Sequence, residues 1–203
     1  MGNVQRRISA IPALADAISP GLTIAERRGL AIWQVAVFDD PGASRIAAAL
    51  GLRLPPALGS GKSPDGWSAL CTGPHRWLAV ADTERSFPLP GESTESSVLA
   101  VDLSHARTVI RLSGARLFEM LSKGCKVDLH PSRFGPGTCV QTSIGHFSAL
   151  IHLVDNGPTA DLYIARSYAE AFSEWLADAV LDSSAGETRS SDVLSITHGS
   201  TED

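Results

Sequence analysis

Hydrophobic and polar residues follow one another in patterns that predict short strands and a few amphipathic helices. Leu30–Phe38 is rich in β-branched and aromatic residues, which is typical of a buried strand. Asp39–Pro41 follows it, and an aspartate cap with a proline in the first turn predicts a helix over 42–50. Prolines and glycines then crowd the segment from Leu54 to Gly66, which predicts a surface loop.

Two short strands and a second loop complete the first half of the chain. Residues 67–71 and 76–81 are apolar runs on either side of a Thr-Gly-Pro-His turn, so we expect a pair of strands. Thr83–Ser97 is polar and rich in proline and glycine near its middle. This composition predicts a loop, and we place a boundary between two lobes there.

The second half shows a cleaner alternation. We expect strands at Val98–Asp102 and Arg107–Leu112. Ser113 is positioned to cap a helix over 114–122, and Gly124 to end it. Three further strands are predicted at 139–143, 146–154 and 161–165, the first two joined as a hairpin.

An apolar stripe near the carboxyl end predicts one more helix that packs against a sheet. Ser167 and Glu170 have the spacing of a capping box, which would mark the start of this helix. The stripe consists of Tyr168, Ala171, Phe172, Trp175, Leu176, Ala179 and Val180. Ser183–Asp203 is dominated by Ser, Thr, Asp, Glu and Gly, so we expect a disordered tail there.

Together these elements predict an α+β protein, with antiparallel sheets that carry helices on one face and form two ferredoxin-like strand-helix-strand lobes. We expect an N-terminal α+β lobe over 1–97, a C-terminal α+β lobe over 98–182 and the disordered tail over 183–203. No repeat of residues is strong enough to indicate a duplication.

Composition excludes several classes of function. The 203 residues can bury roughly 70% of their unfolded surface without disulfides or metals. The net charge of −5 is spread along the chain without a basic stripe, so we expect no nucleic acid as partner. No apolar run approaches the roughly 20 residues of a spanning helix, and the first residues lack the apolar core of an export signal. An odd number of cysteines without a Cys-x-x-Cys pair favours a reducing, cytoplasmic location; they are Cys71, Cys125 and Cys139.

Gly59–Ser63 reads Gly-Ser-Gly-Lys-Ser and is similar to the end of a phosphate-binding loop. The full pattern needs a glycine where Pro56 stands, five residues before Gly61. Pro64 follows where the helix should begin, so the aligned amides and the helix dipole would both be missing. We therefore interpret the segment as a flexible loop.

The histidines have no spacing typical of a metal site. His146 and His152 lie on one predicted strand about 20 Å apart, too far to share a metal ion. His75, His105 and His130 are scattered, with no zinc-type spacing. We expect no metal and interpret these histidines as hydrogen-bonded structural residues.

Two candidates for nucleophilic chemistry remain. Ser104 and His105 are adjacent, so a strand would point them to opposite faces, and we expect a turn instead. Cys125 lies between Lys123 and Lys126, which favour a thiolate, but it follows a helix C-terminus, which opposes one. A reactive thiol and a small buried thiol both stay open. We therefore predict no catalytic, cofactor-binding or metal-binding residue.

Short motifs along the chain carry a resemblance to one known family. They are Cys71–Leu78, Asp102–Arg107, Leu112–Gly114, Lys123–Cys125, Asp128–Pro131, Gln141–Thr142, Asp161–Tyr163 and the aromatic positions within Ser167–Trp175. From Gly29 to Ala179 the chain resembles the gamma subunit of heterotetrameric sarcosine oxidase. That family is similar to the glycine-cleavage T protein and other folate-handling domains.

The resemblance implies a place in a four-subunit flavoenzyme beside alpha, beta and delta subunits. Such an enzyme demethylates sarcosine oxidatively to glycine, gives hydrogen peroxide and, with tetrahydrofolate, forms 5,10-methylenetetrahydrofolate. The resemblance also implies that FAD, FMN, NAD and zinc are held by the partner subunits and none by this chain. It supplies no catalytic residue, and no Gly-x-Gly-x-x-Gly follows a predicted strand. The chain is thus expected to be a non-catalytic structural subunit.

Two alternative functions stay open beside this one. A stand-alone folate-binding protein of the T-protein or iron-sulfur maintenance type also resembles the chain at Lys123–Cys125. A Gly-Gln-Glu element follows the cysteine in that group, whereas Val127–Leu129 stands here. A nucleotide-hydrolysing switch would rest on Gly59–Ser63 alone.

A structural subunit should expose apolar surface to its partners. Aromatic residues are enriched where protein surfaces meet. The four tryptophans, Trp33, Trp67, Trp77 and Trp175, are therefore candidates for such a surface, with the core as the other place for them.

Overall fold

The computed structural model describes residues 9–11, 17–88 and 97–181, which form two antiparallel sheets flanked by helices. Sheet A has the strand order β1-β2-β8-β11-β10-β9, and sheet B has the order β4-β5-β6-β3-β7. The strands of sheet A are β1 Ala17–Ser19, β2 Leu22–Arg27, β8 Arg107–Ser113, β9 Cys139–Ile144, β10 Phe147–Asp155 and β11 Thr159–Ala165. Those of sheet B are β3 Ala31–Val37, β4 Ser60–Lys62, β5 Trp67–Gly73, β6 Arg76–Ala81 and β7 Val98–Asp102. The predicted α+β class with antiparallel sheets is confirmed.

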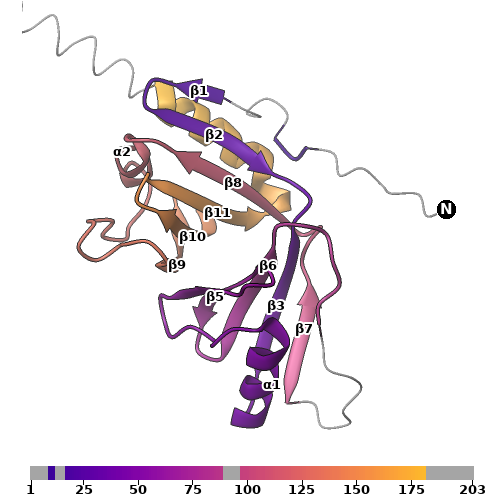
Figure 1. Ribbon diagram of the computed structural model, residues 1–203. Helices are drawn as coiled ribbons and strands as arrows, with labels where there is room; N and C mark the ends of the chain where they lie inside the picture. Colours follow the sequence, from indigo (N-terminus) through magenta and orange to yellow (C-terminus); the bar gives the residue numbers. More distant parts are fainter. Residues whose placement is uncertain (1–8, 12–16, 89–96, 182–203) are drawn as a thin grey trace, which may run out of the picture.

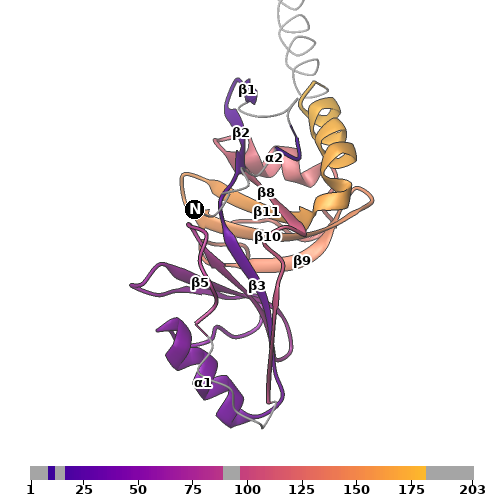
Figure 2. The same ribbon diagram turned by 90° about the vertical axis from the view of Figure 1, so that its right-hand side faces the viewer.

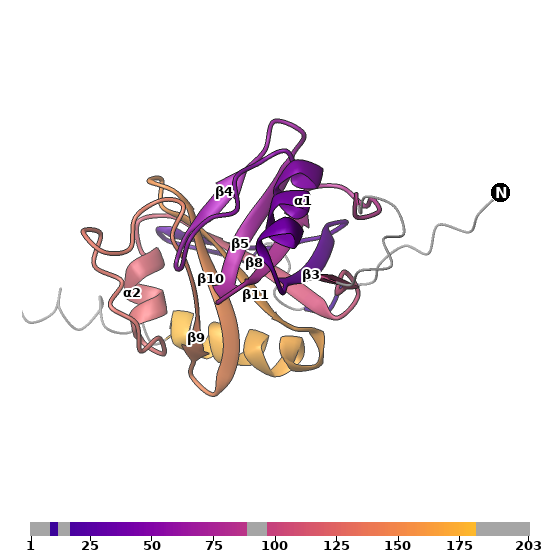
Figure 3. The same ribbon diagram turned by 90° about the horizontal axis from the view of Figure 1, so that it is seen from below.

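The elements stack as helix, sheet, sheet and helix (Figures 1 and 2). α1 (Asp40–Leu50) lies on the outer face of sheet B, and α2 (Leu117–Ser122) and the helix over 169–181 lie on the outer face of sheet A. Seen from the α1 side, the last helix lies behind the strands of sheet A (Figure 3). Each sheet thus carries its helices on one face, as predicted, and the inner faces of the sheets meet.

Two hydrophobic cores follow from these layers. Ile110, Leu112, Ile151, Leu162, Phe172 and Leu176 belong to the core between sheet A and its helices. Val35, Ile46, Leu78, Val109, Leu150 and Tyr163 belong to the second core, which runs from α1 through sheet B to the inner face of sheet A. The second core therefore joins the two sheets into one body.

The two sheets are built by the same sequence of elements. One unit runs β3-α1-β4-β5-β6 with the spatial order β3-β6-β5-β4, and the other runs β8-α2-β9-β10-β11 with the order β8-β11-β10-β9. The strand that precedes each unit joins the other sheet: β2 pairs with β8, and β7 pairs with β3. The fold is therefore a structural repeat with exchanged edge strands, which no pattern of residues had indicated.

The two crossings between the sheets bind one another. The chain passes from β2 to β3 and from β7 to β8, and Ser104 on the second crossing binds Ile32 at the start of β3. The Ile32 amide donates to Ser104 Oγ at 2.9 Å, and the Leu103 amide donates to the Ile32 carbonyl at 2.8 Å. Ser104 and His105 thus lie in a turn, as predicted, and Ser104 is a buried structural residue.

Local signals at α1 act as the sequence predicts. The Asp39 side chain accepts from the Gly42 amide at 2.6 Å, and proline occupies the first turn. Gly51 ends the helix in the left-handed conformation at φ 64°, which a residue with a side chain adopts at a cost. Strand β3 and helix α1 therefore lie close to their predicted bounds.

Other local predictions are wrong. Ser113 is the last residue of β8 and does not cap α2, which begins at Leu117 without a side-chain cap. The last helix begins with a 3-10 turn, η1 (Arg166–Tyr168), in place of the capping box at Ser167. Its buried stripe includes Ala169 and Ser173, while Tyr168 and Ala171 face outward.

Strands β1, β2 and β4 were not predicted, and β4 lies inside the predicted loop over 54–66. The sheets also do not divide the chain at residue 97, because β2 and β7 cross between them. The lobe bounds 1–97 and 98–182 therefore stay a prediction about folding units. The tail over 183–203 lies outside the described residues.

Trp175 packs on two glycines and fixes the last helix against sheet A. A Cβ added to Gly124 would lie 2.5 Å from the Trp175 ring and 2.8 Å from the Gly145 amide nitrogen. The Gly145 amide also donates to the Gly124 carbonyl at 3.0 Å. Gly124 is thus required by close packing and not by an unusual backbone angle.

We expect Gly124→Ala to lower the free energy of unfolding by about 2 kcal/mol, because the new methyl group overlaps the indole ring and a backbone amide. Urea unfolding followed by tryptophan fluorescence measures the loss. Gly135→Ala is the matched control, since nothing lies within 4 Å of its added Cβ. Equal stability of the two variants would contradict the packing argument.

Candidate site between the two sheets

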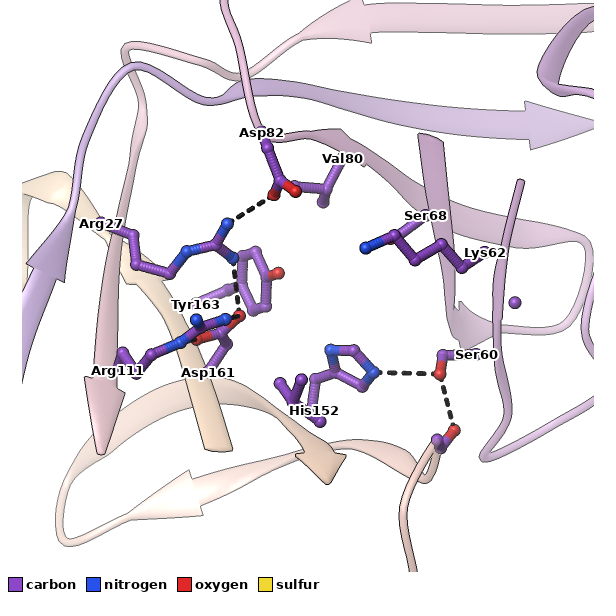
Figure 4. Close-up of a pocket in the computed structure, with 13 residues that line it drawn as sticks. Arg27, Ser60, Lys62, Ser68, Val80, Asp82, Arg111, His152, Asp161 and Tyr163 are labelled. Atoms are coloured by element: carbon purple, nitrogen blue, oxygen red, sulfur yellow. Dashed lines mark hydrogen bonds and ion pairs between the residues drawn. The ribbon is translucent and has the colours of Figure 1, made fainter. Parts of the chain in front are cut away.

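A polar cavity of about 430 Å³ opens between the inner faces of the sheets (Figure 4). Side chains from both sheets line it, including Arg27, Arg111, His152, Asp161 and Tyr163 from sheet A. Ser60, Lys62, Ser68 and Val80 line it from sheet B, with Asp82 just after β6. The cavity therefore exists only when the two sheets are docked.

Asp161 is the centre of a buried ion-pair cluster. It is 1% exposed, on β11, and lies directly opposite Arg111 on β8. Arg111 donates from Nε at 2.7 Å and from a terminal nitrogen at 2.9 Å, and Arg27 donates to the same carboxylate at 2.7 Å. Both oxygens of Asp161 are thus occupied by guanidinium groups.

Arg27 extends the cluster from sheet A to sheet B. Its other terminal nitrogen donates to Asp82, which follows β6. Burial alone would lower the pKa of Arg27, but Asp161 and Asp82 raise it overall. The two arginines and two aspartates form a charge-balanced group across the junction.

His152 from sheet A and Ser60 from sheet B meet across the cavity. His152 on β10 lies opposite Asp161 on the neighbouring strand β11. Its Nε2 is 3.0 Å from Ser60 Oγ. Ser60 Oγ donates its one proton to the Gly137 carbonyl at 2.8 Å, so the histidine must donate to the serine. Nε2 of His152 therefore carries a proton.

The surroundings of His152 keep the imidazole neutral. Burial lowers its pKa below the ordinary value of 6.5, Asp161 opposes this shift, and Arg111 and Arg27 add to it. Tyr163 is also neutral, because burial raises the pKa of its phenol well above the usual range. The Lys62 side chain extends into the cavity from β4 (Figure 4).

This arrangement contains a serine, a histidine and an aspartate but not a catalytic triad. A triad needs the histidine to accept the serine proton and the carboxylate to bind the other ring nitrogen. Here the serine proton goes to a backbone carbonyl, and both carboxylate oxygens bind arginines. In this arrangement the side chains bind one another and the backbone, within sheet A and across to sheet B.

The other predicted candidates lie outside this cavity or serve the fold. Gly59–Ser63 contributes the edge strand β4, and no helix follows it before β5. His75, His105 and His146 lie in turns, and His130 bonds Ser132 at 2.7 Å. None of these four histidines lines the cavity, whereas His152 does. Among the described residues, no three His, Cys, Asp or Glu side chains gather as a metal site would require.

Cys125 is half-buried and is not part of the cavity. The Lys123 ammonium donates to the Ala179 carbonyl at 2.6 Å, so it is engaged with the last helix. Cys139 is buried between the sheets, and burial raises its pKa to about 12, which keeps its thiol protonated. Cys71, Cys125 and Cys139 are all free thiols.

The tryptophans belong to the packing of the molecule. Trp67 and Trp77 are buried, and Trp33 and Trp67 both contact Phe87. Trp77 donates to the Pro55 carbonyl at 3.0 Å. The core interpretation is therefore correct for these three and for Trp175, and the exposed apolar residues are different ones.

The cluster could not be predicted from the spacing of its members. Arg27 and Asp161 are 134 positions apart, and Ser60 and His152 are 92 apart. The one usable signal is the pair of opposed charges, Arg111 and Asp161, on predicted strands. Recognising it requires the register between β8 and β11.

The fold of this chain is also found in a more distant protein of known structure. Over 77% of this chain and 45% of the other, the structure is similar to glycine cleavage system aminomethyltransferase T from Bartonella henselae, with a TM-score of 0.52. The sequence identity is 11%, so the likeness is one of fold. The chain therefore has the fold seen in the glycine-cleavage T protein.

The family follows from closer relatives. The model of the sarcosine oxidase, gamma subunit family matches residues 36–182. The chain is 32% identical over 156 residues to sarcosine oxidase subunit gamma of Corynebacterium sp. (strain U-96), which covers 75% of each chain. It is 31% identical over 190 residues to the subunit gamma of Arthrobacter sp., covering 87% of this chain and 91% of the other. The chain belongs to the sarcosine oxidase gamma subunit family, which confirms the resemblance predicted from its motifs.

A solved relative has the same fold over most of its length. A chain of the heterotetrameric sarcosine oxidase from Corynebacterium sp. U-96, in complex with pyrrole 2-carboxylate, matches with a TM-score of 0.74 and 26% identity. The match covers 85% of this chain and 90% of that chain. In the described part of this chain, no helix is long and apolar enough to cross a bilayer.

We expect Asp161→Asn to lower the free energy of unfolding by about 3 kcal/mol, because it leaves Arg27 and Arg111 without their buried counter-charge. Chemical unfolding of the full-length chain measures the change. Asp65→Asn is the control, since Asp65 is exposed and outside the cluster. A loss no larger than in the control would contradict a structural role for the cluster.

Stability should fall as the pH drops below about 6.5. The pKa of His152 is lower in the folded protein than in the unfolded chain, so the unfolded state binds more protons in this range and gains on acidification. Urea midpoints between pH 5 and pH 8 in His152→Gln and the unaltered chain isolate this effect. If the urea midpoints of the two proteins change with pH in the same way, the lowered pKa of His152 is not coupled to folding.

Proposed function

We propose that this chain is the gamma subunit of a heterotetrameric flavoenzyme that oxidatively demethylates sarcosine to glycine. Family membership across residues 36–182 is the observation that carries the proposal. It is supported by relatives named subunit gamma and by the match to a chain of a heterotetrameric sarcosine oxidase. Oxygen is reduced to hydrogen peroxide, and the methyl carbon is released as a one-carbon unit, which leaves as 5,10-methylenetetrahydrofolate when tetrahydrofolate is present.

We propose further that the chain itself is non-catalytic. In the described part of the chain, Ser60, His152 and Asp161 are committed to hydrogen bonds that hold the two sheets together. Two of the free thiols support this proposal, since Cys139 stays protonated by burial and Cys125 lies away from the polar cavity. FAD, FMN, NAD and zinc then belong to the alpha, beta and delta subunits, and the assembly is cytoplasmic.

A stand-alone folate-binding protein is the second candidate. The fold shared with an aminomethyltransferase T favours it. The replacement of the expected Gly-Gln-Glu element by Val127–Leu129 weighs against it. Retention of folate by the purified chain without any partner would favour this candidate over the subunit.

The proposal predicts that the tagged full-length chain brings three further subunits with it from its native host. The complex should be yellow, because its partners hold flavin, and it should oxidise sarcosine with release of peroxide. Subunit masses, the flavin absorbance spectrum and a peroxide assay measure these outcomes. A colourless chain that purifies alone would contradict the proposal.

A structural role is distinguished from a catalytic one within the same complex. His152→Gln and Cys125→Ser should leave kcat within about twofold of the unaltered complex once equal amounts of assembled enzyme are compared. A large loss of kcat with assembly intact would show that this chain takes part in the chemistry.

A further inference from the structure

The outer edge of sheet B differs from the corresponding edge of sheet A. In the structural repeat, β7 on β3 corresponds to β2 on β8. Sheet A continues beyond β2 with the short strand β1, whose Ala17, Ile18 and Ser19 pair with β2. Among the described residues, no strand pairs with the outer edge of β7. Sheet B therefore ends one strand earlier than its counterpart.

The backbone of β7 offers free hydrogen-bonding groups at this edge. The Phe38 amide donates to the Ser97 carbonyl, and the Leu103 amide donates to the Ile32 carbonyl. In an antiparallel pair such bonded positions alternate with unbonded ones. The N–H and C=O groups of Val98, Ala100 and Asp102 therefore point away from β3.

The side chains beside this edge are apolar and exposed. Leu99 is 52% exposed and Val101 is 43% exposed, and they lie opposite Ala36 and Gln34 on β3. Phe38, which continues the same face beyond β3, is 69% exposed. Edge strands of soluble proteins usually carry a lysine, a proline or a bulge that prevents pairing. β7 reads Val-Leu-Ala-Val-Asp and carries no lysine or proline.

Segments of the same chain are poor occupants of this edge. Residues 9–11 bond Glu26 on β2, and the helix over 169–181 covers sheet A, so both described ends of the chain lie on the sheet A side. Residues 89–96 precede β7, but their sequence Leu-Pro-Gly-Glu-Ser-Thr-Glu-Ser is rich in residues that disfavour strands. The parts of the chain that the structure describes supply no further strand beside β7.

We infer that a partner subunit adds an extended apolar segment to β7, as the strand that sheet B lacks. The backbone groups of Val98, Ala100 and Asp102 supply the hydrogen bonds, and Phe38, Leu99 and Val101 supply the apolar contact. This inference rests on the proposed function, since it takes the occupant from the subunits of the same oxidase.

Ala100→Pro tests the hydrogen-bonding edge. Proline removes the outward N–H of residue 100 and leaves the bonds between β7 and β3 in place. We expect at least about tenfold weaker association with the partner subunits, measured on full-length chain co-expressed with them. Gln141→Pro is the matched control, because Gln141 points its N–H outward from the middle of β9, the last strand of sheet A. Circular dichroism and thermal midpoints show whether both variants are folded.

The apolar contact is tested separately. The double variant Leu99→Lys, Val101→Lys should also weaken association by at least about tenfold, since it places charge where apolar side chains would be buried. Leu181→Lys, which alters a still more exposed leucine on the last helix, should leave association unchanged. Normal assembly of both the proline and the double lysine variant would overturn the inference and leave the proposed function standing.

Amide hydrogen exchange separates a partner strand from a segment of this chain. The amides of Val98, Ala100 and Asp102 should exchange rapidly in the free full-length chain and slowly in the assembled enzyme. Slow exchange in the free chain would mean that the chain covers its own edge, and rapid exchange in the complex would mean that nothing does. Either result would overturn the inference. If the unaltered chain recruits no subunit at all, the proposed function fails with it.

Discussion

The exchange of β2 and β7 between the sheets is the constraint on which the rest of the molecule depends. Because each unit gives its leading strand to the other sheet, neither sheet can be completed without the other. The turn after β7 is held to the start of β3 by two bonds: the Ile32 amide donates to the Ser104 hydroxyl, and the Leu103 amide donates to the Ile32 carbonyl. A buried amide without a partner is costly, so the turn after β7 and the start of β3 must form together. The cavity between the sheets is a consequence of this docking.

The ion pairs around Asp161 act on the same junction. Charges buried in this way gain little over a well-packed apolar group, but removal of one partner leaves the others uncompensated. Arg27 stands at the end of β2, where the chain is about to leave sheet A, and it reaches both Asp161 and Asp82. Such a group discriminates against any other register of β2, because a slip by one residue would turn Arg27 to the opposite face. The cluster therefore specifies the arrangement more than it adds to stability.

The sequence predicts those helices and strands whose signals lie within a few neighbouring residues. The strand at Leu30–Phe38 and the helix after Asp39 carry their periodicity and caps within a few residues, and both form close to the predicted bounds. Strand β4 carries no such local signal. Ser60–Lys62 has a poor strand composition and becomes a strand only by pairing with β5. Ser113 illustrates the opposite case, since pairing with Thr159 and Thr23 keeps it in β8 although it is a good helix cap. The exchange of edge strands and the Asp161 cluster lie beyond any local pattern, since they join residues far apart in the chain.

The structure contains a polar cavity although the sequence predicts no site residue. The hydrogen bonds of the polar groups in the cavity bear on that prediction. A serine beside a histidine becomes a nucleophile only if its proton can move to the imidazole. In this chain the Ser60 hydroxyl donates its hydrogen bond to the Gly137 carbonyl, and the nearby carboxylate is held by two arginines. Ser60, His152 and Asp161 are thus each bonded within sheet A or across to sheet B. Buried polar groups whose bonds are satisfied in this way fix the two sheets in one arrangement, so the surfaces and edges of the molecule have one defined shape.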